Sequence, residues 1–351
     1  MKAAPVLHAL AAYPDFHQRL VHTGQHYDVT LSDRFFQQLA LPEPDVNLGV
    51  GSASHAVQTA EVMMRLEPEL IAHRPGVLVV YGDVNSTMAA ALVAAKLLIP
   101  VAHVEAGLRS FDWTMPEEIN RLVTDRLASL LLTPSDDADE NLVREGIDPA
   151  KVSRIGNVMI DSLVRSLPAA TPTAALDRVG LSSGTPFVLL TLHRPSSVDD
   201  PDLLRRLMGA ISEIARDIAV IFPVHPRTRA RLGGESVGDG VLLTEPLGYF
   251  EFIGLEQAAA LVITDSGGVQ EETTYLGVPC LTVRDNTERP VTITQGTNKL
   301  VGRDPEVLVA AVREALSMPT GSRRIPELWE GRAGERAAQV ITRFLRGTHS
   351  D

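Results

Sequence analysis

The sequence has almost no cysteine: Cys280 is the only one among 351 residues, so no disulfide can form within the chain. No apolar run reaches the roughly 20 residues that a membrane-spanning helix needs. The N-terminus also lacks the basic segment followed by an apolar one that marks a secretory signal. These absences predict a protein of the reducing cytoplasm with no membrane partner.

Motifs of several common sites are missing as well. No G-x-G-x-x-G fingerprint occurs, so a nicotinamide cofactor is not supported, and no Walker lysine is present. No C-x-x-C spacing points to a metal ion, and no G-x-S-x-G pattern points to acyl transfer. The net charge of −12 argues against a nucleic-acid partner, although a helix N-terminus can still bind an anionic small molecule.

Short apolar runs alternate with helix-like segments along the whole chain, whose length allows two domains. This alternation predicts an α/β fold with two Rossmann-like, doubly wound domains. Because Pro168–Pro186 is rich in Ala, Thr, Ser, Gly and Pro, it is the best linker candidate. We expect domains at 1–167 and 183–329, with a C-terminal helix at about Ala333–Leu345 packing back on the first. The expected strands are Arg19–His22, Val77–Tyr81, Val101–Val104, Leu130–Thr133, Val152–Ile155, Phe187–Thr191, Ala219–Phe222, Val241–Leu243, Leu261–Thr264 and Cys280–Val283.

Three carboxylates stand out in the first half of the chain. Asp83 and Glu105 follow the ends of expected strands, and Glu117 opens the helix after a proline. The neighbouring Glu118 is typical of a first-turn helix charge. Because ligands of α/β sheets bind beyond the carboxyl ends of the strands, we expect these acids to line an interdomain active-site cleft. Carboxylates crowded in one cleft differ in pKa, which suits proton transfer.

The segment Leu261–Glu272 reads as a strand, then Asp-Ser-Gly-Gly, then a helix. Gly267 and Gly268 allow a phosphate to approach the backbone, where the free N–H groups of the helix start and the Ser266 hydroxyl can hold it. Glu272 lies one helical turn further on and can accept from a ribose hydroxyl. An ordinary tight turn with a serine cap is the alternative, but the second glutamate favours a nucleotide-diphosphate site.

Histidines follow two expected strands of the second half. His193-Arg194 can contact phosphates or move a proton, and His225 has a similar setting. In the first half, Gln25 and His26 at a strand end suit hydroxyl recognition. A solvated loop or a turn is the alternative for each of these three places.

Taken together, the motifs resemble those of the non-hydrolysing UDP-N-acetylglucosamine 2-epimerases from residue 2 to about residue 345. The motifs that carry the resemblance are TGQHYD, GDVNST, HVEAGLRS, MPEEINR, GNVMID, TLHRP, FPVHPRT, EPLGYFEF, TDSGGVQEET, LGVPCLT and RDNTERP. The resemblance implies the two-domain glycosyltransferase-B fold, a homodimer and no cofactor. It also implies interconversion of UDP-GlcNAc and UDP-ManNAc at C2, through elimination of UDP to 2-acetamidoglucal and its re-addition.

The same resemblance assigns roles to individual residues. It places the catalytic groups on Asp83, Glu105, Glu117 and His193. It places the contacts to UDP on Phe252, Ser266, Gly267, Gly268, Glu272 and Arg289. Further candidates are Gln25, His26, Arg109, Arg194 and His225.

This sequence departs from the family pattern in three places. Family members usually begin with a strand and a GTRPE loop, and here the chain begins at the lysine that normally follows. We therefore expect the natural product to carry a further strand and its loop before Met1. The usual HRREN is HRPSS at 193–197. The stretch Gly51–Ser54 lacks the Arg-Gln of members that bind a second, activating UDP-GlcNAc, which argues against allosteric activation.

Three other functions compete with this interpretation. A hydrolysing epimerase, which releases ManNAc and UDP, would use the same fold and acids. A glycosyltransferase of the same fold would need an acceptor groove and apolar or basic membrane-facing patches, and the first half of the sequence shows neither. A non-catalytic nucleotide-sugar sensor would not need all four candidate catalytic residues.

Overall fold

The computed structural model describes residues 1–25, 36, 38–233, 238–318 and 324–348. The chain forms two compact units. Unit 1 comprises Met1–Ser162 and Glu327–Asp351, and unit 2 comprises Leu163–Pro326. In the described part of the chain, no helix combines the length and the apolar character needed to cross a membrane.

Unit 1 contains a four-stranded parallel sheet in the order β3-β4-β5-β6 and a separate parallel pair, β1-β2. Its strands are β1 (Val21–His22), β2 (Val46–Asn47), β3 (Leu78–Tyr81), β4 (Val101–Val104), β5 (Leu130–Thr133) and β6 (Val152–Arg154). Its helices are α1 (Ala3–Leu10), α3 (His55–His73), α4 (Asn85–Lys96), α5 (Pro116–Leu127), α6 (Asp136–Arg144), the short 3-10 helix η1 (Pro149–Lys151) and α16 (Ala333–Thr348). Helix α7 (Val158–Ser166) begins in unit 1 and ends in unit 2.

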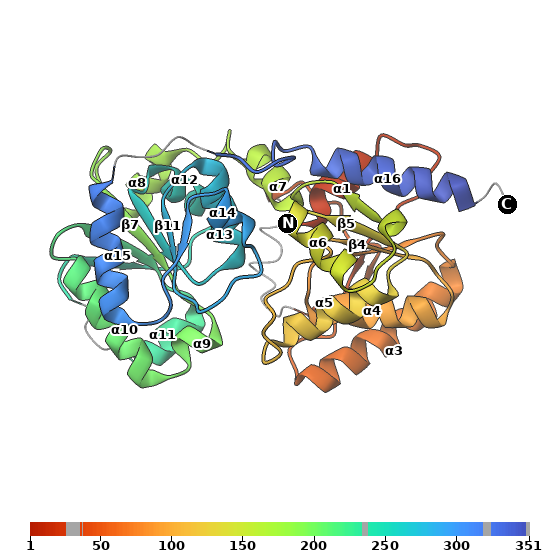
Figure 1. Ribbon diagram of the computed structural model, residues 1–351, viewed down its shortest axis with the longest axis horizontal. Coiled ribbons are helices and arrows are strands. Elements are labelled where there is room, and N and C mark those ends of the chain that lie inside the picture. Colours follow the sequence, from red (N-terminus) through yellow and green to blue (C-terminus); the bar gives the residue numbers. More distant parts are fainter. Residues whose placement is uncertain (26–35, 37, 234–237, 319–323, 349–351) are drawn as a thin grey trace. The chain divides into compact units, whose positions relative to one another are not determined.

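Helices cover both faces of the unit 1 sheet. On one face, Val80, Val101 and Leu131 pack with buried side chains of α3 and α4. On the other face, Ala102 and Val104 pack with α1 and α16. These last two helices come from opposite ends of the sequence and lie side by side (Figure 1). Since β4 and β5 are buried on both faces, their sequences are apolar almost throughout.

Unit 2 is a six-stranded parallel sheet in the order β12-β11-β10-β7-β8-β9. Its strands are β7 (Phe187–Thr191), β8 (Ala219–Pro223), β9 (Val241–Thr244), β10 (Leu261–Thr264), β11 (Cys280–Thr282) and β12 (Asn298–Leu300). Its helices are α8 (Pro172–Val179), α9 (Pro195–Val198), α10 (Pro201–Ile214), α11 (Pro226–Leu232), α12 (Tyr249–Ala258), α13 (Gly267–Leu276), α14 (Val291–Thr294) and α15 (Pro305–Ser317).

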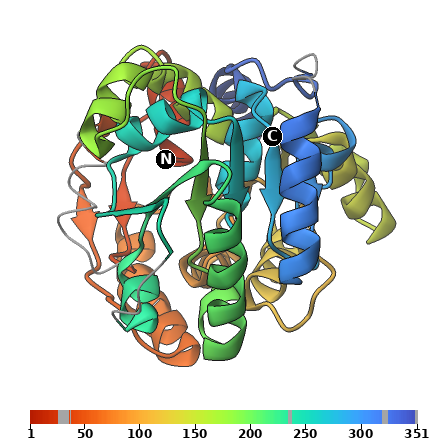
Figure 2. The same cartoon turned by 90° about the vertical axis from the view of Figure 1, so that its left-hand side faces the viewer.

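The two faces of the unit 2 sheet carry different helices. Helices α10 (green) and α15 (blue) lie side by side along one face (Figure 2), where Val188 and Leu190 enter their core. Helices α8 and α12 cover the other face, where Phe187 and Leu189 are buried. Both α10 and α15 begin with an aspartate cap followed by proline, a favourable helix start.

These sheets confirm the predicted parallel α/β class. The expected strand Arg19–His22 is shorter, since only Val21–His22 pairs, and strands β2 and β12 were not expected. The expected linker Pro168–Pro186 is not an open connection. It contains α8, whose Leu176 and Val179 are buried in the core of unit 2.

Candidate active site

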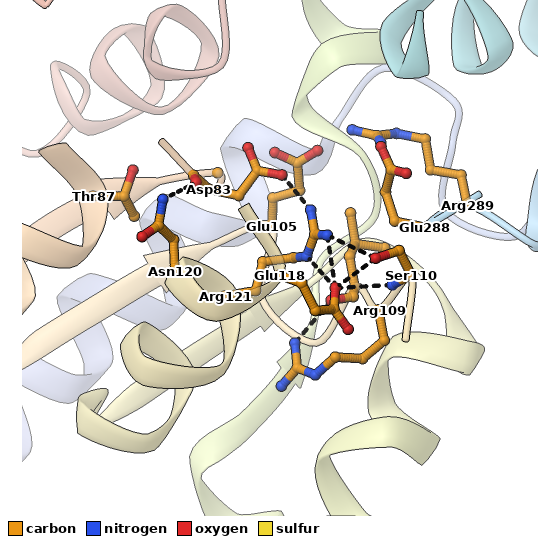
Figure 3. A network of polar contacts seen from close by, with 12 residues as sticks. Asp83, Thr87, Glu105, Arg109, Ser110, Glu118, Asn120, Arg121, Glu288 and Arg289 are labelled. Atoms are coloured by element: carbon orange, nitrogen blue, oxygen red, sulfur yellow. Dashed lines mark hydrogen bonds and ion pairs between the residues drawn. The ribbon is translucent and has the colours of Figure 1, made fainter. Parts of the chain in front are cut away.

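Asp83 lies in the turn between β3 and α4, directly after Gly82. Gly82 has a φ of +64°, and a Cβ at this position would lie 3.2 Å from Oε2 of Glu105. The backbone of the turn therefore approaches Glu105 more closely than a larger residue permits. The carboxylate of Asp83 forms an ion pair with Nη1 of Arg121 (Figure 3), and the Asp83 side chain remains 22% exposed.

Glu105 directly follows β4 and has a φ of +73°, a left-handed conformation that is uncommon for residues other than glycine. Its N–H donates to the carbonyl of Leu132 at 3.0 Å. Its buried carboxylate forms an ion pair with Nζ of Lys2. Strained backbone of this kind gathers at functional sites, where the surrounding structure must hold it in place.

Arg121, on α5, connects the Asp83 turn to Glu118. Its Nε and Nη2 donate to Oε2 of Glu118 at 3.0 and 2.7 Å, while Nη1 faces Asp83. Glu118 also accepts from the N–H groups of Ser110 and Phe111, each at 2.9 Å. Burial opposes ionisation, but these hydrogen bonds and the Arg121 charge outweigh it and lower the pKa of Glu118. Glu118 is thus a buried structural carboxylate and not only the surface helix charge that we expected.

Glu117 precedes Glu118 in the first turn of α5 and has a different environment. Its side chain is half-buried, and within the described residues no hydrogen bond or ion pair engages its carboxylate. The two adjacent glutamates therefore divide their roles. Glu118 anchors the loop before α5, while Glu117 is left available to a ligand.

An amide side chain supports the Asp83 turn from α5. Nδ2 of Asn120 donates to the carbonyl of Asp83 at 2.9 Å. At the start of α4, the N–H and the hydroxyl of Ser86 donate to Oε1 of Gln25 at 3.1 and 2.7 Å. The candidate Gln25 therefore contacts the start of α4 at Ser86, which is close in sequence to Asp83. The candidate His26 lies outside the described residues.

The candidate Arg109 lies in the interior of unit 1. It is 2% exposed and bonded to Asp125 at 2.7 Å and to Glu145 at 2.7 and 2.8 Å. Burial opposes its charge, but both carboxylates outweigh this effect and raise the pKa of Arg109. These contacts give Arg109 a role in holding the loop between β4 and α5.

In unit 2, His193 follows β7 and is held by Asp265. The carboxylate of Asp265 accepts from the N–H groups of His193 and Arg194 at 2.9 Å each, and its Oδ1 lies 3.0 Å from Nδ1 of the His193 ring. Burial raises the pKa of Asp265, but the His193 contacts outweigh it, so the pKa is lowered. An ionised Asp265 accepts the Nδ1 proton and leaves Nε2 of the 40% exposed ring for a ligand.

Helix α13 begins directly after Asp265, with Ser266 as its cap residue. The Ser266 side chain makes no capping hydrogen bond, and Ser266 and Gly268 are partly exposed. A Cβ at Gly267 would lie 2.5 Å from Nη1 of Arg289, so only glycine fits beside that guanidinium. Backbone N–H groups, a hydroxyl and an arginine at one helix start are suited to a phosphate.

Arg289 belongs to a group of buried ions at the carboxyl ends of β10 and β11. It bonds to Glu271 at 2.7 Å and also to Glu288, which Arg284 contacts at 2.8 Å. Burial raises the pKa of Glu288, but the charges of Arg289, Arg284 and Arg194 outweigh it and hold the pKa well below its usual value. The cations and carboxylates of this group therefore hold one another in place.

Glu272 is buried on α13 and accepts a hydrogen bond from the hydroxyl of Tyr249 at 2.7 Å. Burial raises the pKa of Glu272 to about 7; the charge of Glu271 adds to this shift and the Tyr249 hydroxyl opposes it. Glu256, on α12, is fully buried, and within the described residues neither of its oxygens has a hydrogen-bond partner. Burial and the charge of Glu272 raise its pKa. The candidate Phe252, also on α12, is partly buried against the hydrophobic core that contains Phe187 and Leu189.

Two further candidates lie near His193. The rings of His193 and His225 are 6.1 Å apart between centroids. Arg194 donates from Nε to the carbonyl of Asp265 at 2.9 Å and approaches Glu288 at 3.5 Å. Burial lowers the pKa of Arg194. The charges of Arg284 and Arg289 lower it further, and the charge of Glu288 opposes this shift.

The structure thus gathers the candidates into two groups, one in each unit. Asp83, Glu105 and Glu117 follow strand ends or begin a helix in unit 1, and the remaining catalytic and UDP candidates belong to unit 2. Sequence reasoning missed the partners that hold them: Lys2, Asn120 and Arg121 in unit 1, and Tyr249 and Asp265 in unit 2. Arg121 and Asp265 are part of the motifs MPEEINR and TDSGGVQEET. Their charge within motifs that carry candidate residues was the signal that could have identified them. In the part of the chain described, no group of three or more His, Cys, Asp or Glu residues could hold a metal ion.

Comparison with known proteins identifies the family of the chain. A family profile described as UDP-N-acetylglucosamine 2-epimerase matches residues 8–342. A Methanocaldococcus jannaschii protein of that name is 42% identical over 355 residues, covering 97% of this chain and 95% of its own. A Pseudomonas aeruginosa protein named UDP-2,3-diacetamido-2,3-dideoxy-D-glucuronate 2-epimerase is 41% identical over 319 residues, covering 90% and 89%.

Solved structures give the same result. The M. jannaschii epimerase in complex with UDP-GlcNAc and UDP has a TM-score of 0.89 at 41% identity and covers 97% of this chain and 96% of that one. The Neisseria meningitidis UDP-GlcNAc 2-epimerase bound to UDP-GlcNAc has a TM-score of 0.88 at 28% identity, covering 99% and 96%.

The fold is of the two-domain glycosyltransferase-B type, as the sequence predicted. Within that class, the chain belongs to the UDP-N-acetylglucosamine 2-epimerase family.

Proposed function

We propose that this protein interconverts UDP-GlcNAc and UDP-ManNAc without net hydrolysis. In this reaction a base removes the C2 proton, the bond between C1 and the diphosphate oxygen breaks, and UDP leaves with the electron pair. The sugar becomes 2-acetamidoglucal, with a double bond between C1 and C2. Protonation of C2 on the opposite face and return of the UDP oxygen to C1 complete the inversion.

The observation that carries the proposal is the group of carboxylates in unit 1. A C2 proton is weakly acidic, so its removal and return need a positioned base and a positioned acid. Asp83 and Glu105 are each paired with a cation, Arg121 and Lys2, whereas Glu117 has no recorded partner among the described residues. We assign the proton transfers at C2 to these three carboxylates, with Glu117 as the one best able to exchange a proton.

Unit 2 is proposed to bind the UDP part. The diphosphate would lie at the start of α13, on the N–H groups of Gly267 and Gly268, with the Ser266 hydroxyl and Arg289 as further donors. Glu272 would accept hydrogen bonds from the ribose hydroxyls. These bonds would either replace the one from the Tyr249 hydroxyl or be made in addition to it. The Nε2 of His193, fixed by Asp265, would stabilise charge on the departing diphosphate.

The product distinguishes this reaction from hydrolysis. When the purified protein is incubated with UDP-GlcNAc and the mixture is separated by anion-exchange chromatography, we expect a stable equilibrium of UDP-GlcNAc and UDP-ManNAc. Steady accumulation of free ManNAc and UDP would instead establish the hydrolysing epimerase.

The P. aeruginosa relative supports a second candidate substrate, because it is almost as similar as the M. jannaschii protein and is named for a diacetamido uronate. The same incubation with UDP-2,3-diacetamido-2,3-dideoxy-D-glucuronate decides between them. We expect the larger kcat/KM for UDP-GlcNAc, and the reverse order would reassign the substrate.

The homodimer implied by the resemblance also stays a prediction. Light scattering coupled to size-exclusion chromatography should give twice the chain mass of 37.9 kDa.

A further inference from the structure

A histidine on the central part of the unit 1 sheet has no role in the reaction as described so far. His103, on β4, is fully buried; it pairs with Leu131 of β5 and lies two residues after the buried Val101. Its Nε2 lies 2.8 Å from the carbonyl oxygen of Gly82, and its Nδ1 lies 2.6 Å from Oδ1 of Asp125. A buried polar ring needs both of these bonds, because a buried nitrogen without a partner is destabilising.

The two partners of the ring are both hydrogen-bond acceptors. A carbonyl oxygen can only accept, so Nε2 must donate to Gly82. Asp125 is an acceptor as well, because the N–H of Gly107 donates to its Oδ2 at 3.1 Å and Arg109 contacts the same oxygen at 2.7 Å. Burial raises the pKa of Asp125, but the charges of His103 and Arg109 outweigh it, so the pKa is lowered. Both ring nitrogens therefore face oxygen acceptors, Nε2 the carbonyl of Gly82 and Nδ1 the carboxylate of Asp125.

The His103–Asp125 pair is attached to two backbone turns that carry candidate catalytic groups. Gly82 is the residue before Asp83, and Gly107 is the second residue after Glu105. The backbone conformation of both turns is also restricted by their glycines. Gly82 has a φ of +64°, and Gly107 has a φ of +82°, with the carbonyl of Ala138 only 2.4 Å from where a Cβ would lie. The His103–Asp125 pair thus fixes the carbonyl of one turn and the N–H of the other through a single buried contact.

We propose that His103 and Asp125 are positioning residues that hold the Asp83 turn and the Glu105 turn at a fixed separation, so that both carboxylates act on one sugar ring. This inference rests on the proposed epimerase function. Its physical basis is that a displacement of about 1 Å in a catalytic group can cost about 100-fold in rate. Neither residue touches the substrate in this account.

Two substitutions of the same histidine separate the two bonds. The amide nitrogen of glutamine occupies a position similar to Nε2, so His103→Gln keeps a donor for Gly82. The amide of asparagine corresponds to Nδ1, so His103→Asn keeps a donor for Asp125 and loses the bond to Gly82. The matched control is His8→Asn, because His8 on α1 also contacts a backbone carbonyl, that of Leu39 at 3.1 Å, away from the carboxylates.

For each variant, kcat and KM for UDP-GlcNAc, the melting temperature and the release of 2-acetamidoglucal are measured. We expect His103→Asn to lower kcat by about 100-fold, with KM changed by less than about threefold, since a misplaced carboxylate affects the transition state more than substrate binding. We also expect this variant to release 2-acetamidoglucal, because UDP is still eliminated while the return of a proton to C2 is slowed. His103→Gln should keep at least about ten times more activity than His103→Asn, and His8→Asn should lose stability without loss of kcat.

The outcomes separate this inference from the proposed function. If the unaltered protein does not epimerise, the function fails. If it does, and His103→Asn has the kcat of the unaltered protein per folded molecule, the positioning role is wrong. If His103→Asn does not fold, Asp125→Asn is measured in the same way. A lowered kcat with glucal release supports the role, and failure of both variants to fold gives the pair a purely structural one.

Discussion

Both units place charged side chains at the carboxyl ends of parallel strands, but they differ in how they treat buried carboxylates. In unit 1, Glu118 and Asp125 have cations and N–H groups around them, and their pKa values are lowered. Unit 2 has such carboxylates too, in Asp265 and Glu288, but it also buries the pair Glu256 and Glu272, whose pKa values are raised. Burial alone therefore does not decide the charge of a carboxyl group; the donors around it do.

The difference corresponds to the proposed division of labour. Unit 1 uses ionised carboxylates as a rigid frame near Asp83, Glu105 and Glu117, the acids that we propose to act on the sugar. Unit 2 instead offers donors, at the start of α13 and on Arg289, and keeps a protonatable glutamate, Glu272, for the ribose. Substitutions of these acids in unit 1 should therefore affect turnover. In unit 2, substitutions of the UDP contacts should affect binding of UDP, and those of His193 or Asp265 should affect turnover.

The largest expected effect comes from the carboxylates of unit 1. We predict that Asp83→Asn, Glu105→Gln and Glu117→Gln each lower kcat by at least about 100-fold, because each removes a group that transfers or stabilises a proton. UDP affinity, measured by calorimetry, should stay nearly unchanged. The matched control is Glu67→Gln on the exposed face of α3, and circular dichroism checks folding. A variant that loses activity only by unfolding would give that residue a structural role.

A smaller loss of turnover is expected from the orienting partner of His193 in unit 2. Asp265→Asn keeps the shape of the side chain but presents an amide in place of an acceptor for Nδ1 of His193. We predict a kcat about 10- to 100-fold lower, within the range of general acid–base effects. The pH–rate profile should change with it, and an unaltered profile with unaltered kcat would remove His193 from the mechanism.

Binding, more than turnover, should respond to Glu272. We predict that Glu272→Ala weakens UDP binding by roughly 1–3 kcal/mol, the cost of a lost hydrogen bond to a charged or buried group. Calorimetry measures this directly, with Glu306→Ala, an exposed residue of α15, as the control from the same unit. Equal UDP affinity in Glu272→Ala and the unaltered protein would contradict the ribose assignment.

The smallest expected effect is a difference in the sign of two pH dependences. The folded pKa of Glu118 is below its unfolded value, so its stabilisation is present above about pH 4.3 and is lost as the pH falls below it. The folded pKa of Glu256 is above its unfolded value, so its contribution to stability falls as the pH rises from about 4.3, by up to about 1.4 kcal/mol per pH unit.

Urea unfolding of Glu118→Gln and Glu256→Gln from pH 3 to pH 8 tests these signs. Relative to the unaltered protein, Glu118→Gln should lose more stability at pH 7 than at pH 3. Glu256→Gln should become relatively more stable as the pH rises. Only the slope matters, since the buried glutamine amide adds an offset that does not depend on pH. Parallel slopes for the two variants would break the comparison between the units.

The sequence predicted the parts of the site that follow from local pattern. Apolar runs indicated the parallel strands, and the residues just after them, such as Asp83, Glu105 and His193, were singled out because parallel strands end at one edge. The Asp-Ser-Gly-Gly turn likewise indicated the start of α13. The short strands β2 and β12 were missed because two or three residues carry too little periodicity to detect.

Contacts between distant residues were not predictable in this way. Lys2 reaches Glu105 across more than a hundred residues, and the His103–Asp125 pair depends on how α5 packs on β4. Composition also says little about how the linker candidate packs. Pro168–Pro186 has the composition of a connection, but Leu176 and Val179 give α8 an apolar face that the core of unit 2 covers. Tertiary packing overrode composition there.

The central claim is that a proton leaves C2 and a solvent-derived one returns on the other face while the sugar goes back to UDP. Proton NMR of UDP-GlcNAc incubated with the protein in deuterated water tests it most directly. The account predicts loss of the C2 proton signal as UDP-ManNAc appears, with deuterium at C2 of both nucleotide sugars and no net accumulation of free sugar. UDP-ManNAc that keeps its original proton at C2, or free ManNAc as the end product, would contradict it.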